Sequence, residues 1–278
     1  MKIVKYCQLY EQDVVELWNK CCSFDPITVN KFRLQALFDD NFDEELCLVA
    51  KDKDRIIGFI LGTKRKFPYL DRGLEPDRGW INVMFVDHDY IRQGIGQRMY
   101  DETESKLISM GCKNITLGAY SPNYFFAGID PEHYPKAIGF FEKNGYKPGE
   151  KHYSMGRNLH GYQISKEISE KKRLREKEGY EFIPFDYSYA LQLLKFCKEE
   201  FGGGWKRNVL ISMQKNVAEN NIILVLKKKE ICAFCMSAID GNELRFGPIG
   251  VSAAERNQGI GGILLELKMY DMCKKGLL

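Results

Sequence analysis

The residues most suited to chemistry lie in two glycine turns, Gln93–Gly96 and Gln258–Gly261, which both read Gln-Gly-Ile-Gly. An apolar run precedes each turn, and a helical pattern follows it. A tight turn at a helix N-terminus presents main-chain N–H groups and the positive end of the helix dipole to an anion. Glycine lets the backbone approach that anion because it has no Cβ. The pattern therefore predicts a cradle for a phosphate or pyrophosphate group.

The two turns belong to longer stretches that repeat at a constant spacing. Val86 and Val251 are separated by 165 positions, and so are Gly94 and Gly259. One Gly-x-Gly is equally typical of an ordinary strand-to-helix turn. Its repetition at the same place in the same strand–turn–helix pattern favours a duplicated binding unit.

Two common nucleotide-binding motifs do not fit these turns. A dinucleotide fingerprint needs a third glycine three residues further on, where the chain has Met99 and Leu264. A P-loop needs Gly-Lys-Ser/Thr after its glycines, and neither copy has it.

Length and composition predict two ordinary domains. The chain has 278 residues and 44% hydrophobic content, so each half can bury a core. Its net charge of +3 gives no argument for a nucleic-acid partner. No apolar run could span a membrane, and the N-terminus does not resemble a signal peptide. Nine cysteines, mostly in apolar segments, indicate reduced thiols, so we expect a cytoplasmic protein.

Neither the cysteines nor the histidines indicate a metal. Cys232 and Cys235 have the spacing of a zinc or redox pair, but they lie in a strand pattern without a second pair of ligands nearby. The four histidines show no metal spacing. We therefore expect buried thiols and no metal.

The first domain, expected at residues 1–160, alternates strand and helix patterns. A polar loop at 67–78 and an aromatic loop at 121–134 interrupt the pattern. Strands are expected at 2–7, 45–51, 56–64, 80–86, 115–120, 146–148 and 152–157, and helices at 13–22, 29–39, 96–110 and 135–143.

A charged helical connector is expected at 161–179, and a second domain at 180–278. Acids and bases are interleaved in the connector, which favours a solvated helix over a nucleic-acid arm. The spacing between the copies falls from 175 in the hairpin to 165 at the central strand, so the first copy has ten extra residues around 67–78. We expect this loop to face the substrate. The second domain lacks counterparts of 114–158, which suggests an incomplete or truncated sequence.

At its glycine turns the chain resembles the GCN5-related N-acetyltransferases (GNAT family), whose signature is Arg/Gln-x-x-Gly-x-Gly/Ala after a valine-bearing strand. The second copy fits this signature fully from Arg256 to Gly261. The first departs from it at Ile91, with the arginine displaced to Arg92, and we expect this departure to weaken the site. The segment Phe140–Tyr146 resembles the family's late helix and turn, so the likeness covers the whole first domain.

This resemblance implies an α/β fold class with an α+β mixed sheet. It implies two tandem GNAT folds, in a two-domain layout similar to that of mycothiol synthase, with the second fold lacking its C-terminal strands.

The resemblance also implies acetyl-CoA as the cofactor. In the family, the thioester and pantetheine arm lie along the central strand, and the pyrophosphate lies in the glycine turn. Carried over residue by residue, the cofactor contacts of the first copy are Met84, Phe85, Val86, Arg92, Gln93, Gly94, Ile95, Gly96 and Gln97. Those of the second copy are Ile249, Gly250, Val251, Arg256, Asn257, Gln258, Gly259, Ile260 and Gly261.

The family often uses a tyrosine of its late helix as the acid for the leaving thiolate, and the matching residue here is Phe141. Tyr134 and Tyr124 are the substitutes considered, although packing or loop anchoring is the more common role of such tyrosines. The sequence indicates no general base.

The function implied is acetyl transfer from acetyl-CoA to a primary amine of a small molecule, by direct attack on the thioester. The alternative is a non-catalytic CoA- or acyl-CoA-binding protein with a regulatory or structural role, motivated by Ile91 and Phe141. The expected partner is the amine, a homodimer is one option, and no nucleic-acid or membrane partner is expected.

Overall fold

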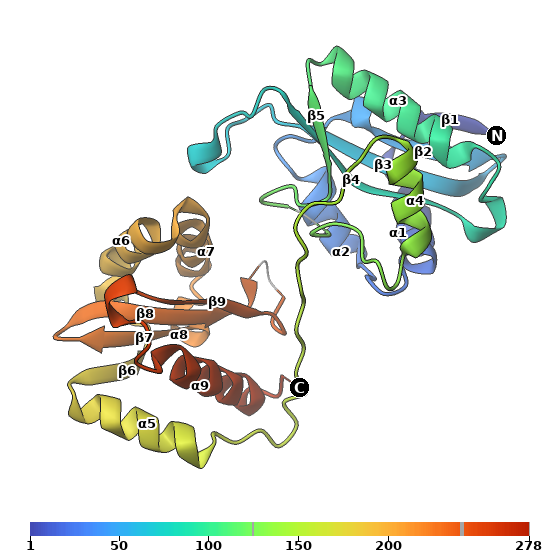
Figure 1. Cartoon of the computed structure of the whole chain (residues 1–278). Helices are drawn as coiled ribbons and strands as arrows, with labels where there is room; N and C mark the ends of the chain where they lie inside the picture. The colour runs from blue at the N-terminus through green and yellow to red at the C-terminus, as the bar shows by residue number, and fades with distance from the viewer. Residues whose placement is uncertain (124, 240–241, 278) are drawn as a thin grey trace. The chain divides into compact units, whose positions relative to one another are not determined.

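The structure is a computed structural model that describes residues 1–123, 125–239 and 242–277. It divides into two compact units, Met1–Tyr153 and Ser154–Leu278. Each unit has a sheet with helices on both faces (Figure 1).

The first unit is built on a mixed sheet, which confirms the expected mixed α/β fold. Its first four strands pair antiparallel in chain order, and the fifth runs parallel to the fourth. Within the described residues these strands are β1 (Lys2–Lys5), β2 (Cys47–Asp52), β3 (Arg55–Lys64), β4 (Arg78–Val86) and β5 (Asn114–Leu117).

Helices cover the two faces of this sheet separately (Figure 1). On one face, Trp18 packs with Phe59 and Phe85, and on the other, Met99 packs with Ile60. Strand side chains alternate between faces, so the unit has two cores. The helices are α1 (Glu11–Cys21), α2 (Val29–Phe32, continued by a wider turn at Arg33–Leu37), α3 (Ile95–Ser109) and α4 (Pro135–Lys143).

The strands expected at 146–148 and 152–157 do not form, so that prediction was wrong. Tyr146 instead packs its ring against Tyr100 and Phe141, at 6.1 and 5.4 Å between centroids. The following residues are exposed and include Pro148, which has no N–H to donate to a ladder. Tyr146 is therefore the last residue of this stretch that packs in the core between the sheet and α3.

The second unit contains an antiparallel sheet in chain order, β6-β7-β8-β9. In its described residues α9 covers one face of the sheet, and α6 and α7 cover the other. The strands are β6 (Tyr180–Pro184), β7 (Ile222–Lys227), β8 (Glu230–Ser237) and β9 (Phe246–Val251). The helices are α5 (Lys166–Lys177), α6 (Ala190–Phe201), α7 (Gly203–Gln214), α8 (Ala218–Asn221) and α9 (Ile260–Lys274).

Helix α5 lies within the second unit. Its N-cap residue Ser165 donates its backbone N–H to Glu266 of α9 at 2.8 Å. Two of its basic residues pair with acids of the same helix, Lys171 with Glu167 and Lys172 with Glu176. Acids of the same helix thus partly neutralise the charged face that is expected to be solvated.

Strand β9 is an edge strand in the described part of the second unit. Beside its first residue, Phe246, the side chains of Leu159 and Tyr162 pack with Met269 and Met272 of α9. The segment of the second unit that precedes α5 therefore covers the start of β9 and the end of α9 with apolar side chains. It does not pair with β9 as a strand.

Gly250 in β9 allows a test of the packing in the second unit. A Cβ there would clash with Phe201 and lie 2.8 Å from Trp205, and the rings of these two residues stack at 4.4 Å between centroids. We expect Gly250→Ala to lower the free energy of unfolding by about 1–3 kcal/mol, since overpacking forces these rings to shift. Urea denaturation measures the change.

Gly262 provides the control, because a Cβ there would meet only Ile168, at 3.7 Å. Gly262 lies inside α9, where alanine is the better helix former, so Gly262→Ala should raise the free energy of unfolding by up to about 1 kcal/mol. Equal effects of the two substitutions would contradict the proposed packing at Gly250.

Candidate functional site

The glycine turn of the first unit joins the end of β4 to α3. After Val86 the chain makes a short 3-10 turn at His88–Tyr90 and then takes two left-handed conformations, at Arg92 (φ +62°) and Gly94 (φ +76°). Gly94 is the N-cap residue of α3. The N–H groups of the first turn of α3, which have no acceptor within the helix, therefore point out of its N-terminal end.

The second unit has the same backbone course 165 positions later. The 3-10 turn lies at Ala253–Glu255, and the left-handed residues are Asn257 (φ +63°) and Gly259 (φ +77°). Helix α9 begins directly after Gly259 and has 15 residues, as α3 has. The sequence repeat is thus also a repeat of main-chain conformation.

Both turns have the form that a phosphate cradle requires. A Cβ built on Gly94 or on Gly259 would meet nothing within 4 Å, so the space beside each glycine is open. An anion placed there faces main-chain N–H groups and the positive end of a helix dipole. The turns therefore fit the pyrophosphate of coenzyme A, the group that the family resemblance implies.

Strand β4 also has the open main-chain edge that a pantetheine arm could use. It pairs with β5 only from Arg78 to Ile81, and the last contact is the N–H of Gly118 donating to the carbonyl of Ile81 at 2.9 Å. Beyond this point no strand of the described residues pairs with that side of β4, which continues to Val86. We call this divergence of β4 and β5 the fork. Its main-chain groups that turn away from β3 are available to a ligand.

The fork and the glycine turn of the first unit lie next to each other. The position of a Cβ on Gly96 is 3.4 Å from Met84 and 3.6 Å from Val86, and Phe140 of α4 lies 4.0 Å away. Three of the residues expected to contact the cofactor therefore meet at the first turn of α3.

Other expected residues of the first site have clear surroundings. Ile95 is buried, and Phe85 is buried against Trp18, at 5.6 Å between ring centroids. Gln97 donates to Asn144 at the end of α4, at 2.7 Å. Arg92 and Gln93 are exposed beside the turn.

The two turns are braced by different side chains. In the first unit, the buried carboxylate of Asp87 accepts from Lys20 at 2.6 Å and from Arg55 at 2.8 Å. In the second unit Ser252 stands at this position, and Arg256 donates from Nε to the carbonyl of Val251 at 3.3 Å. Ile91, the counterpart of Arg256, cannot make that bond. Sequence reasoning missed Asp87 because its partners are distant in the chain.

The remaining expected residues of the second site surround its own turn. Gln258 accepts from Arg175 of α5 at 2.9 Å, so a basic residue lies beside that turn. Ile260 is buried, and Gly250 lies under the Phe201–Trp205 pair. Ile249 is half-buried in the core shared with α9.

Tyr134, at the start of α4, forms hydrogen bonds with the segment that follows α1. Its hydroxyl donates to Asp25 Oδ2 at 3.0 Å and accepts the N–H of Phe24 at 3.2 Å. Burial and the hydrogen bond to Asp25 raise the pKa of Tyr134 above its ordinary value. These contacts support loop anchoring, and a role as acid stays a prediction. Tyr124 lies outside the described residues.

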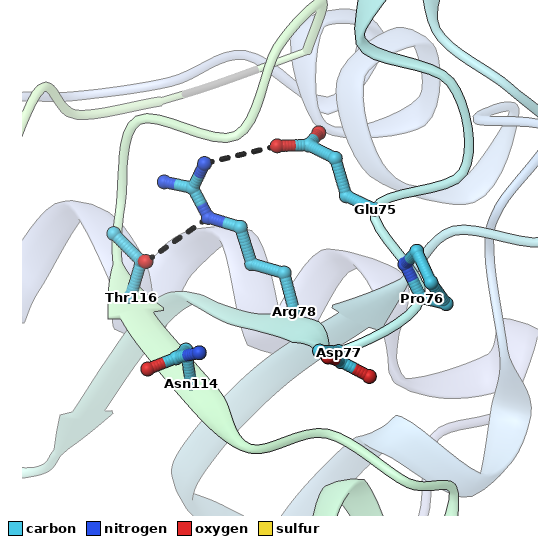
Figure 2. Close-up of a pocket in the computed structure, with 6 residues that line it drawn as sticks. All are labelled: Glu75, Pro76, Asp77, Arg78, Asn114 and Thr116. Atoms are coloured by element: carbon cyan, nitrogen blue, oxygen red, sulfur yellow. Dashed lines mark hydrogen bonds and ion pairs between the residues drawn. The ribbon is translucent and has the colours of Figure 1, made fainter.

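A surface pocket of about 450 Å³ opens at the first residues of β4 and β5 (Figure 2). Glu75 there accepts from Arg78, which also donates to Thr116. Arg78 begins β4, whereas the glycine turn follows Val86. At about 3.3 Å per strand residue, the pocket is about 26 Å from the turn. It therefore lies apart from the glycine turn.

Among the described residues, no group of three or more His, Cys, Asp or Glu side chains could hold a metal ion. In the same part of the chain, none of the helices is both long and apolar enough to cross a bilayer.

Comparison with known proteins identifies the class of the first unit. Residues 11–146 match the model of the acetyltransferase (GNAT) family. The chain therefore contains a GNAT acetyltransferase domain, from a family that generally uses acetyl-CoA. N-alpha-acetyltransferase 30 of Dictyostelium discoideum is 29% identical over 115 residues, which cover 40% of this chain and 53% of that relative. The chain thus matches about half the length of this relative.

Two solved structures share the fold across the described chain. One is a GCN5-related glucosamine N-acetyltransferase region of a fungal multi-domain GH3 β-N-acetylglucosaminidase, with 19% identity and a TM-score of 0.73, covering 99% of this chain and 34% of that one. The other is a GCN5-related N-acetyltransferase from Sphaerobacter thermophilus, with 10% identity and a TM-score of 0.66, covering 99% and 84%. At these identities the likeness shows the fold alone.

Asp87 provides a test of the brace in the first unit. We expect Asp87→Ala to lower the free energy of unfolding by about 2 kcal/mol at pH 7, since it removes two hydrogen bonds from charged donors to a buried carboxylate. The exposed Asp89, which also contacts Lys20, is the control, and Asp89→Ala should cost less than about 0.5 kcal/mol.

The contribution of Asp87 should also depend on pH. Burial raises the pKa of its carboxyl, but the bonds from Lys20 and the Asp89 N–H and the charge of Arg55 outweigh it, so the pKa lies below its ordinary value. The difference between wild type and Asp87→Ala should be complete above about pH 5 and shrink as the pH falls below about 4. Denaturation from pH 3 to 7 measures it, and a difference that grows toward low pH would contradict this role.

Proposed function

We propose that the protein is an acetyl-CoA-dependent N-acetyltransferase that transfers an acetyl group to a primary amine of a small molecule. The observation that carries this proposal is the fork between β4 and β5 beside the glycine turn, within a GNAT acetyltransferase domain. Acetyl-CoA supplies the activated acetyl thioester when bound. The relative named above acts, by its name, on α-amines, so a protein N-terminus is the main alternative acceptor.

Different residues of the first unit would bind the cofactor and activate its thioester. The turn from Arg92 to Gln97 would hold the pyrophosphate through main-chain N–H groups. Met84, Phe85 and Val86 would align the pantetheine arm along the open edge of β4. A main-chain N–H near Val86 is available to polarise the thioester carbonyl. The amine must reach the fork unprotonated, and the side chain that accepts its proton is not assigned.

The second unit is proposed as a further GNAT-like fold in tandem, with its own CoA-binding turn. The support is the matched backbone of its turn, from Arg256 to Ile260, and its complete signature. It has β9 in place of β4 and no described strand on the outer edge of β9. Ile249, Gly250 and Val251 would offer their main-chain groups on that edge.

Acetyl-CoA binding should depend on the glycines at the helix N-termini. We expect Gly94→Glu and Gly259→Glu each to weaken binding in its own unit at least about tenfold, because a carboxylate then occupies the anion position and repels phosphate. Isothermal calorimetry gives the affinity and stoichiometry for each variant. Loss with Gly94→Glu alone would assign the working site to the first unit, and loss with Gly259→Glu alone to the second.

Matched controls exist at the other ends of the same helices. Gly111 and Gly276 have φ values of +88° and +75° and open space at the Cβ position, as the turn glycines have. Gly111→Glu and Gly276→Glu therefore impose the same backbone strain, but neither places a carboxylate in one of the two glycine turns. Equal loss of affinity in the controls, or no binding by wild type, would refute the proposed sites.

Turnover separates the proposed enzyme from a non-catalytic CoA-binding protein. With a working site, adding amines should increase release of free CoA thiol from acetyl-CoA above the rate in buffer. The amines should include polyamines, amino sugars, amino acids and a short peptide with a free α-amine. Tight acetyl-CoA binding without amine-dependent thiol release would favour the non-catalytic alternative.

A further inference from the structure

A set of hydrogen bonds centred on Asp39 joins segments that are far apart in the first unit. Asp39 Oδ1 accepts from the Tyr120 hydroxyl at 3.0 Å and from the Asn41 N–H at 2.7 Å. Its Oδ2 accepts from Asn123 Nδ2 at 2.7 Å. One carboxylate thus holds the stretch after β5 against the stretch after α2. We call Asp39, Asn41, Tyr120 and Asn123 the latch.

Asn41 extends the latch to the loop between β3 and β4. Its Nδ2 donates to the Tyr120 hydroxyl at 2.8 Å, and its Oδ1 accepts the N–H groups of Lys66 and Phe67 at 2.7 and 2.9 Å. The latch therefore connects the loop at 65–77 with the segment at 118–123. The first of these regions overlaps the loop around 67–78, which is expected from the sequence to face the substrate.

The latch lies beside the fork. Gly118 makes the last contact between β5 and β4, and Tyr120 follows two residues later. The Tyr120 ring packs on Trp80 of β4, at 5.2 Å between centroids. The chain after β5 and the loop after β3 therefore both pack on Trp80 of β4, through Tyr120 and Arg65, close to the point where β4 and β5 diverge.

The Tyr120 ring is fixed from behind by a buried arginine. The Arg65 guanidinium lies 4.9 Å from the Tyr120 and Tyr69 ring centroids and 4.8 Å from that of Trp80. Its Nε donates to Glu75 at 2.9 Å. Arg65 thus gives Tyr120 a rigid support of cation–π contacts and an ion pair.

The hydrogen bonds of the latch are largely shielded from solvent. Tyr120 and Asn41 are 1% and 6% exposed, and Asp39 is half-buried at the outer end. Hydrogen bonds in such surroundings are strong, and loss of one partner leaves buried polar groups unsatisfied. On the outer side Phe38 and Phe67 are exposed. The latch therefore fixes the spacing of the two loops, and exposed apolar side chains lie beside it at Phe38, next to Asp39, and at Phe67 of the 65–77 loop.

We propose that Asp39 is a positioning residue for the amine acceptor, because the latch sets the spacing of the two loops through which the amine reaches the fork. This inference rests on the proposed acetyltransferase function. The latch includes no residue of either glycine turn, so it acts on the acceptor and leaves acetyl-CoA binding unchanged. The apolar side chains at its outer end favour acceptors with an apolar group near the amine.

The test compares Asp39→Asn with Asp40→Asn in the full-length protein. Asp40 is the exposed neighbour of Asp39, so both variants lose one negative charge at the same place. We expect Asp39→Asn to raise the KM for the best amine about tenfold, to change kcat less, and to leave the calorimetric Kd for acetyl-CoA within twofold. Asp40→Asn should change none of these.

A reciprocal exchange separates positioning from general damage. In Asp39→Asn/Asn123→Asp, the carboxylate moves to position 123 and the amide–carboxylate bond can reform in reverse, so the KM for the amine should fall back toward wild type. Hydrogen-exchange mass spectrometry should show faster exchange at 65–77 and 118–123 in Asp39→Asn, and not at 87–97.

The outcomes distinguish the two proposals. An active wild type whose KM for the amine is unchanged by Asp39→Asn, or an equal loss of acetyl-CoA affinity in that variant, overturns the positioning role alone. Unchanged exchange in both loops also overturns it. A wild type that binds acetyl-CoA but acetylates no amine in the panel overturns the proposed function and the positioning role together.

Discussion

The left-handed main chain between a strand and a helix is the constraint on which both units depend. Each unit must turn from the last residue of a strand into the first turn of a helix, with φ positive at Arg92 and Gly94, or at Asn257 and Gly259. This course leaves the first helical N–H groups free of side chains, so they can face an anion. The rest of each unit holds that turn in place, with the sheet on one side and the helix packed across it.

The two turns keep the same backbone with different supports. The first uses Asp87, buried and bonded to Lys20 and Arg55, whereas the second uses the Arg256 bond to the end of β9. Main-chain geometry is thus more strictly retained than the side chains that brace it, as expected if the ligand is recognised through main-chain groups. The departure at Ile91 therefore has a compensating support that does not appear in the family signature.

The two loops of the first unit that are proposed to position the amine are held by side chains, whereas the glycine turns depend on main-chain conformation. These loops are joined by polar side chains, with Asp39 and Tyr120 at the centre and Arg65 behind them. The strands diverge because β5 ends at Leu117 and the chain after Gly118 joins this network through Tyr120 and Asn123. The fork and the latch are thus two consequences of one event, the departure of the chain from β5.

The sequence by itself determined the local features, namely the strand–turn–helix units and the positions of their glycine turns. These depend on residue periodicity and on glycine conformation, which neighbouring residues fix. The mixed α/β fold of the first unit was an expectation from its resemblance to the GNAT family. The strands expected at 146–148 and 152–157 do not form, because a strand also needs a neighbouring strand with which to pair. Only the tertiary structure decided the fork, the Asp87 brace and the latch. Their partners are separated by tens of residues, as Asp39 and Tyr120 are, and chain folding alone brings such groups within hydrogen-bond distance.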